Sequence, residues 1–210
     1  MYKLIDNAKN EKRQKRRYQM KIFCCMLILI YGIMLIAGQI EARHQNENYV
    51  TLELSQVACK VPIEYWQPDE DYSYASDHMF LIREKNNEYI IYGSELNKCN
   101  EDDWNYGLIQ DQDKVAELID APSESQVRNG IRDCTGLLNS NVIEHRSIIK
   151  QSYAVYSFSS IEQIGNEEYH IYTIYYVQED VRFLEIILEK SPGILTEEDK
   201  EKMLLYTYLN

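Results

Sequence analysis

An uninterrupted apolar run near the N-terminus constrains the fold of this chain more than any other feature. Residues Ile22 to Ile40 include no charged side chain, and a helix of this length, at about 1.5 Å per residue, nearly matches the ~30 Å hydrocarbon core of a bilayer. A buried core helix would show a more polar face. The run therefore predicts a transmembrane helix.

The charges on either side of this run indicate its orientation. Residues 1–21 hold eight Lys and Arg side chains against two acidic ones, a net charge of +6, whereas Glu41 and Glu47 follow the run. Basic flanks stay on the cytoplasmic side of a membrane, so the bulk of the chain is expected outside the cell. The expected organisation is a basic cytoplasmic tail at 1–21, a transmembrane signal-anchor at 22–40 in contact with the lipid bilayer, a stalk at 41–48 and an extracytoplasmic domain at 49–210, in a single-pass protein of the cell membrane.

A cleaved signal peptide is the main alternative to a permanent anchor. Signal peptides share the basic start, but their apolar run is usually only ~7–15 residues long. Gly38 or Ala42 could precede a cleavage site, although neither completes an Ala-x-Ala pattern. Cleavage there would release the same domain as a secreted protein. Lipoprotein processing does not fit, because Cys24 and Cys25 lie at the cytoplasmic start of the run.

The exported part is strongly acidic. The whole chain carries −12, so the residues that follow the basic tail carry −18. Such a domain repels phosphate backbones, which excludes nucleic acid as an expected partner. A cationic protein partner, another envelope protein or a cell-wall component remains compatible with this charge.

The hydrophobic periodicity of residues 49–210 predicts an α+β domain with a mainly antiparallel sheet, a helical middle and a C-terminal helix. Pro62 places the opening strands at a sheet edge, and the last four strands read as an antiparallel meander. The expected strands are Tyr49–Leu54, Val57–Trp66, Met79–Arg83, Glu88–Tyr92, Val142–Lys150, Tyr153–Ser159, Glu168–Gln178 and Val181–Glu189. Helices are expected over 111–120 and 123–138, and a last one is expected after Thr196, which would cap it.

This order of elements resembles a known fold family. An extended lead-in to Val61-Pro62-Ile63-Glu64-Tyr65-Trp66, a hairpin, a helical middle, a meander and a last helix is similar to the PsbP-like α-β-α sandwich of exported proteins. The resemblance covers about residues 49–210. It implies a binding or assembly module without catalytic residues, and it carries no individual residues to transfer.

Three cysteines lie in the exported part, at Cys59, Cys99 and Cys134, without the spacing of a zinc site or a C-x-x-C motif. Buried free thiols are expected, and a bridge from Cys99 to either of the other two is the alternative. A nucleophilic cysteine would need a positioned histidine. His145 and His170 fall in neighbouring expected strands and could pair, although two solvent-facing histidines are the simpler interpretation.

The acidic clusters at 69–71, 101–103 and 111–113 lack the ligand order of a calcium loop. The chain also lacks a G-x-S-x-G elbow, an H-E-x-x-H helix and a glycine loop for phosphate. The sequence therefore predicts no catalytic residues, no metal site and no cofactor.

Aromatic side chains beside these acidic loops are the candidate residues for contact with a partner. They are Trp66, Tyr72, Tyr74, Trp104 and Tyr106. Exposed aromatic residues are enriched in protein interfaces, whereas both tryptophans could instead be anchored in the core.

Three functions are compatible with these observations. The first is a non-enzymatic, membrane-tethered extracytoplasmic binding or assembly module, for example within an envelope or secretion-type complex. The alternatives are an exported hydrolase or thiol enzyme with an unfamiliar site, and a bitopic sensor with a minimal cytoplasmic tail.

Overall fold

The computed structural model describes residues 49–63, 65, 73–84, 88–139, 142–150, 152–191 and 207–208. The tail, apolar run and stalk expected over 1–48 lie outside these residues. Among the helices of the described part, none has the length and apolar character needed to cross a bilayer.

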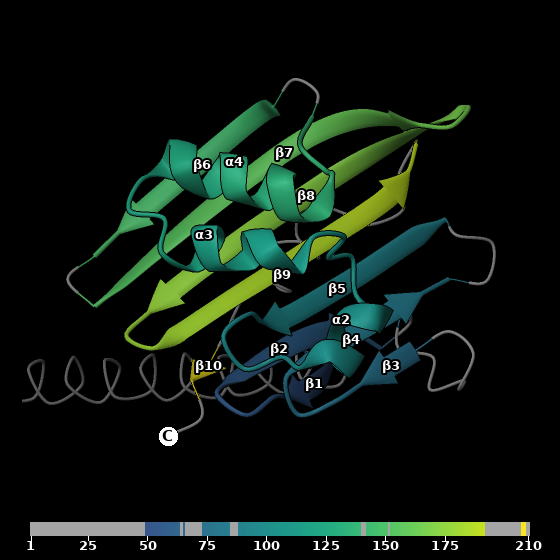
Figure 1. Cartoon of the computed structure of the whole chain (residues 1–210). Helices are drawn as coiled ribbons and strands as arrows, with labels where there is room; N and C mark the ends of the chain where they lie inside the picture. Colours follow the sequence, from purple (N-terminus) through teal and green to yellow (C-terminus); the bar gives the residue numbers. More distant parts are fainter. Residues whose placement is uncertain are drawn as a thin grey trace, which may run out of the picture. The chain divides into compact units, whose positions relative to one another are not determined.

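A seven-stranded antiparallel sheet forms the centre of the domain, in the order β3-β4-β5-β9-β8-β7-β6 (Figure 1). Consecutive strands from β6 to β9 pair along most of their length, because tight turns connect them. The strands are β3 (Ser73–Ala75), β4 (Met79–Arg83), β5 (Tyr89–Glu95), β6 (Val142–Ile149), β7 (Tyr153–Ile164), β8 (Glu167–Gln178) and β9 (Val181–Lys190). The expected hairpin and four-stranded meander are thus confirmed.

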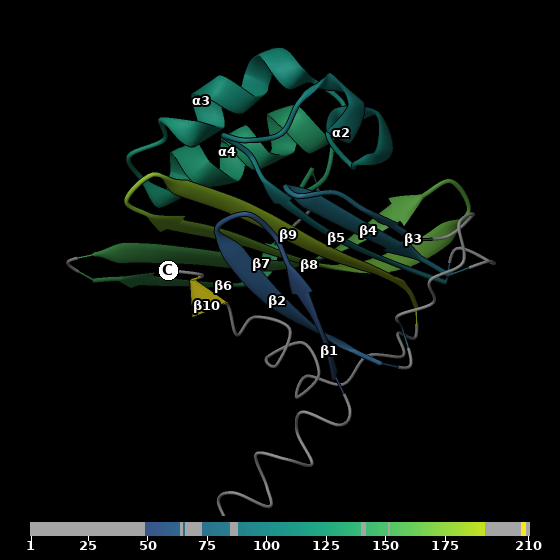
Figure 2. The same ribbon diagram turned by 90° about the horizontal axis from the view of Figure 1, so that it is seen from below.

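A second, three-stranded sheet packs on one face of the first (Figure 2). It contains β1 (Tyr49–Glu53), β2 (Val57–Pro62) and β10 (Thr207–Tyr208), in the order β1-β2-β10. The opening strands are therefore strands, as expected. However, β2 is paired on both sides and does not lie at an edge.

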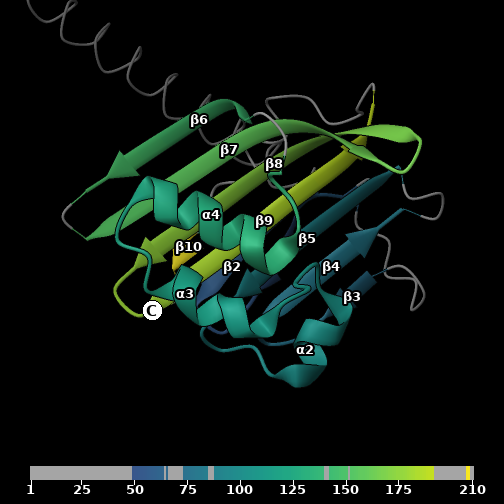
Figure 3. The same cartoon turned by 45° about the horizontal axis from the view of Figure 1, so that its top comes forward.

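Short helices cover the opposite face of the large sheet (Figures 2 and 3). They are α2 (Glu101–Tyr106), the 3-10 turn η1 (Gln112–Lys114), α3 (Val115–Ile119) and α4 (Glu124–Thr135). The apolar residues of α4 recur on one side and are buried. Gly130 lets α4 approach α3 closely, since an added Cβ would lie 3.0 Å from Leu118 Cβ. This contact explains the mid-helix glycine.

Strand β9 contributes side chains to two hydrophobic cores, one on each face of the large sheet. Leu184, Ile186 and Leu188 pack with the helices on one face. Phe183 and Ile187 alternate with them and pack with β1 and β2 on the other face. Because side chains alternate along a strand, an apolar run on both faces requires cover on both, and the helices and the small sheet supply it.

The expected architecture was wrong in its proportion of helix to strand and in its C-terminal element. The described region is α+β in character but is dominated by antiparallel sheet, with 53% strand and 20% helix, so it is not a domain with a substantial helical middle and a C-terminal helix. Near the end of the chain, Thr207 and Tyr208 pair with β2 as a strand. The helix expected after Thr196 falls largely outside the described residues. Strand β7 runs five residues beyond the expected Ser159, because β8 pairs with it as far as Ile164.

Replacing Gly93 with alanine is expected to lower the free energy of unfolding by about 3 kcal/mol. An added Cβ would lie 2.3 Å from Phe80 Cε1 and 3.0 Å from Phe183 Cζ, and Phe80 and Phe183 are both fully buried. Urea denaturation of Gly93→Ala measures the loss. In a Phe80→Leu background the same substitution should cost less, and an equal cost in both backgrounds would contradict the steric explanation.

Candidate functional site

Two of the predicted contact residues meet at the β3 end of the large sheet. The rings of Tyr74 in β3 and Tyr106 in α2 stack in parallel, with centroids 4.3 Å apart and an interplanar angle of 11°. Tyr106 is 54% exposed, and Tyr74 is half-buried against the helix-side core. One aromatic face of this pair is therefore available to a partner.

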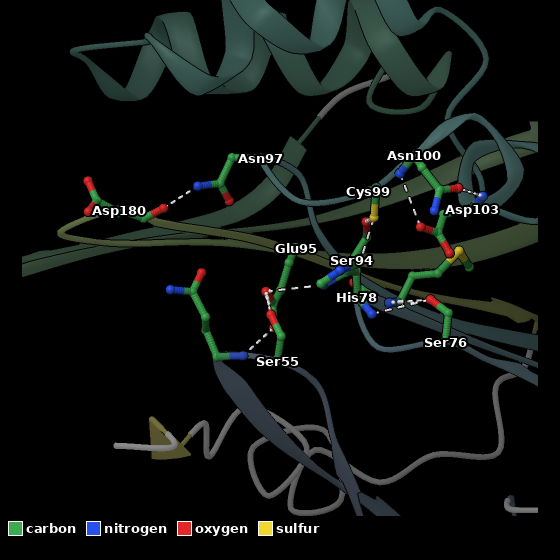
Figure 4. Close-up of polar contacts among 12 residues, drawn as sticks. Ser55, Ser76, His78, Ser94, Glu95, Asn97, Cys99, Asn100, Asp103 and Asp180 are labelled. Carbon is green, nitrogen blue, oxygen red and sulfur yellow. Dashed lines mark hydrogen bonds and ion pairs between the residues drawn. The ribbon is translucent and has the colours of Figure 1, made fainter.

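The helix that carries Tyr106 is held by a capping box (Figure 4). Asn100 Oδ1 accepts a hydrogen bond from the Asp103 N–H at 3.0 Å, and Asp103 Oδ2 accepts one from the Asn100 N–H at 3.1 Å. Such reciprocal bonds satisfy backbone donors that a helix N-terminus otherwise leaves unpaired. The box fixes the start of a helix that is only six residues long.

The same carboxylate also positions Tyr74. Asp103 is buried, and its Oδ1 accepts a hydrogen bond from the Tyr74 hydroxyl at 3.4 Å. Burial, and then the charge of Asp103, raise the pKa of Tyr74 above its ordinary value. The phenol consequently stays neutral and keeps its proton for this bond, so Asp103 joins β3 to α2 beneath the stacked rings.

Two exposed acids complete this surface. Glu101 and Asp102 lie in the first turn of α2 and are exposed. Asp102 precedes Tyr106 by four positions and therefore lies on the same side of the helix. We call Tyr74, Glu101, Asp102 and Tyr106 the tyrosine–acid patch. Carboxylates beside an aromatic face attract cations, both by charge and through the ring quadrupole.

The other predicted contact residues do not join this patch. Trp104 is buried in the helix-side core, in keeping with core anchoring, the alternative considered for both tryptophans. Trp66 and Tyr72 lie outside the described residues. Asn100 and Asp103 were missed as positioning residues, although an Asn followed three residues later by an acid is a recognisable capping signal.

A second polar cluster surrounds Glu95 at the end of β5 (Figure 4). The Glu95 side chain is fully buried and accepts hydrogen bonds from Ser55 Oγ and from the Gln56 N–H, each at 2.8 Å. Ser55 and Gln56 form the turn between β1 and β2. Glu95 thus anchors the small sheet to the large one, and a separation of about forty residues hid this contact from the sequence.

The Glu95 cluster also brings a serine and a histidine together, but in the wrong order for hydrolysis. In a catalytic triad the histidine lies between the serine and the acid and removes the hydroxyl proton. Here the carboxylate lies between them: Ser55 Oγ donates to Glu95, and His78 Nδ1 is 3.9 Å from Glu95 Oε2. Glu95 itself accepts the hydrogen bond from Ser55, with no imidazole between them in this cluster, so the arrangement lacks the order of a triad and supports anchoring.

No disulfide joins the three described cysteines, which are thiols. Cys59 and Cys134 belong to different cores on opposite faces of the sheet, and Cys99 Sγ contacts Ser94 Oγ at 2.9 Å. Burial raises the pKa of Cys99 and of Cys134 to about 12. Burial, followed by the charge of Glu185 at 3.7 Å, raises the pKa of Cys59 as well. A reactive thiolate is therefore scarce at neutral pH.

The two strand histidines do not form a pair. His145 lies level with Phe158 on the helix side of the sheet, and its Nε2 is 3.3 Å from Glu124 Oε1. His170 lies opposite Ile161 and Glu189 on the other face. Within the described ranges, no three His, Cys, Asp or Glu side chains are placed to hold a metal ion together.

No protein-family model matches this sequence, and no curated protein is similar to it. The PsbP-like resemblance accordingly stays a prediction.

Proposed function

We propose that this chain is a membrane-anchored binding module whose extracytoplasmic domain contacts a cationic segment of another protein through the tyrosine–acid patch. The observation that carries the proposal is the exposed Tyr106 ring, stacked on Tyr74 and flanked by the carboxylates of α2. The apolar run at 22–40 and its basic flank support anchoring in the cell membrane, with the domain outside.

The charge of the domain favours a basic partner over other classes. The residues after the basic tail carry a net charge of −18, which draws cationic partners and repels anionic ones. Lys and Arg side chains combine a positive charge with an apolar stem, so they can contact the face of Tyr106 and the carboxylate of Asp102 together. Another envelope protein with an exposed basic segment meets both requirements.

The polar clusters favour binding over catalysis. Glu95 and Asp103 are each engaged in holding one element to another, through Ser55 and Gln56 in the first case and through Asn100 and Tyr74 in the second. The hydroxyl groups beside these carboxylates, those of Ser55 and Tyr74, are themselves engaged in these structural hydrogen bonds. The described thiols are buried or protonated, which supports a module that recognises its partner by surface contact.

A photo-crosslinking residue at position 106 is expected to capture a specific partner in intact membranes. The matched control carries the same residue at Gln163, an exposed position at the β7 end of the β7–β8 hairpin. Replacing Glu101 and Asp102 by Gln and Asn should reduce the position-106 adduct by about tenfold, because two attractive charges are lost. Immunoblotting of the adducts after irradiation measures this.

Two outcomes would contradict the proposal. One is the absence of a specific adduct at 106, or the same adducts at 106 and 163. The other is an adduct that forms equally well in the neutralised variant, which would remove the role of charge. Because adducts are recovered after alkaline extraction, the experiment also tests the anchor: an anchored chain sediments with the membranes, and a secreted one does not.

A further inference from the structure

Strand β6 forms the outer edge of the large sheet, at the opposite end from the tyrosine–acid patch (Figure 1). In the described part of the chain it pairs only with β7. Its residues from Ile143 to Ile149 are all exposed, and Ile143, Ile148 and Ile149 are 63%, 51% and 71% exposed. An exposed edge with apolar side chains is a template for pairing with another strand.

The backbone of β6 is oriented for such pairing. Lys150 N donates to Tyr153 O at 2.8 Å, and hydrogen-bonded pairs alternate along an antiparallel ladder. With the observed register, Glu144, Arg146 and Ile148 direct their N–H and C=O groups toward β7. His145, Ser147 and Ile149 then direct theirs outward, which leaves donors and acceptors along the edge over positions 145–149; a register shift between Val142 and Glu144 makes the strand irregular at Ile143.

The charges of β6 are complementary to a second copy of the same strand. Glu144 and Arg146 flank His145, and their side chains are about 60% exposed; within one copy they already form an ion pair, with Arg146 Nε 3.1 Å from Glu144 Oε1. If two β6 strands pair antiparallel about a two-fold axis at His145, each Glu144 lies opposite the other copy's Arg146. These two positions form non-hydrogen-bonded pairs across the new interface, where side chains approach most closely.

We propose that this edge is a self-association surface, through which β6 pairs antiparallel with β6 of a second copy of this chain about His145. The outward backbone groups of His145 form the central hydrogen-bonded pair, and the two Glu144–Arg146 pairs fix the register. The exposed Ile148 then lies opposite Val142 of the second copy. A shift that places Arg146 on the axis would oppose two like charges and is disfavoured.

Charge exchange tests the register in the full-length chain. The protein is purified in detergent micelles, and its mass is followed by sedimentation over a range of concentrations. Glu144→Arg and Arg146→Glu should each weaken dimerisation by about tenfold, because two attractive pairs become repulsive. The double variant E144R/R146E should return to within about twofold of the original affinity, since it restores both pairs with reversed signs.

A proline substitution tests the backbone pairing separately. Ser147→Pro removes an N–H that points away from β7, so the β6–β7 ladder keeps its hydrogen bonds while the intermolecular one is lost. We expect at least a tenfold loss of dimer affinity for Ser147→Pro and none for Ser147→Ala. Urea denaturation of both variants checks that the domain stays folded, and Ser147→Ala remains the reference if proline shifts the unfolding midpoint.

Three results would overturn the proposal. The first is a chain that sediments as a monomer throughout the concentration range. The second is a dimer whose affinity is unchanged by all the β6 variants, which would place the interface elsewhere. The third is a double charge exchange that fails to restore affinity.

Discussion

Replacing Glu95 with alanine is expected to lower the free energy of unfolding by about 3 kcal/mol. The substitution removes the acceptor of two 2.8 Å hydrogen bonds, from Ser55 Oγ and from the Gln56 N–H, and leaves a void where a fully buried side chain lay. Bonds to a charged acceptor are worth more than neutral ones, and an unsatisfied buried donor costs its full desolvation. Urea or thermal denaturation measures the loss.

Glutamine at position 95 removes the charge of the side chain and keeps its volume. The amide nearly preserves the shape of the side chain, and it can still accept from the Gln56 N–H while it donates to the Ser55 hydroxyl, but both bonds lose the charge of the carboxylate. We expect Glu95→Gln to cost about 2 kcal/mol, and hydrogen exchange in the turn between β1 and β2 to accelerate. Glu53→Ala, at an exposed position, should change stability by less than about 0.5 kcal/mol. A Gln variant as stable as the original would show that the charge of Glu95 adds nothing to the contact, and an Ala variant as stable as the original would show that Glu95 is not an anchor.

The parts of the fold that could be predicted from the sequence are those encoded by neighbouring residues. Strands β6 to β9 follow each other through short turns at positions such as Gly165 and Glu179, both of which adopt positive φ. Alternating apolar residues and a turn signal suffice to predict such a meander, because each strand pairs with the next one in the chain.

The remainder depends on contacts between distant segments. Thr207 pairs with Ala58, although the two residues lie near opposite ends of the domain in the sequence. No local sequence pattern distinguishes this strand from the end of a helix. Tyr74 and Tyr106 could be named from the sequence only as two of five candidate contact residues, and whether they contact a partner stays a prediction. Their stacking depends on Asp103, which joins β3 to α2 through space.

The burial of two acidic residues, Glu95 and Asp103, could not be predicted from hydrophobic periodicity. Glu95 follows an apolar strand and could have been an exposed end residue, yet it is fully buried. Asp103 lies in an acidic cluster that resembles a solvated loop, yet it is buried between β3 and α2. Hydrogen-bond partners decide whether a carboxylate can be buried, and these partners are assembled only when the chain folds.

At pH 8 the Cys99 thiol is expected to be alkylated about a thousandfold more slowly in the folded chain than in the denatured one. Burial raises its pKa from 9.0 to about 12, despite the hydrogen bond with Ser94 that lowers it. Only the thiolate reacts, so the raised pKa reduces the thiolate fraction of Cys99 at pH 8 by about 10³. Labelling with iodoacetamide before and after denaturation, followed by peptide mass spectrometry, resolves each cysteine.

The raised pKa of Cys99 also determines how its alkylation rate and its contribution to stability change with pH. Between pH 7 and 9.5 the folded rate for Cys99 should rise about tenfold per unit, whereas the denatured rate levels off above pH 9. Between pH 9 and about 12 the folded state holds a proton that the unfolded state has lost, so the contribution of Cys99 to stability is complete below pH 9 and declines as the pH rises. Cys99→Ala should make that alkaline decline shallower. Equal folded and denatured rates at pH 8 would contradict the raised pKa of Cys99, whereas a faster rate in the folded chain would reveal an activated thiol and favour the thiol enzyme over the binding module.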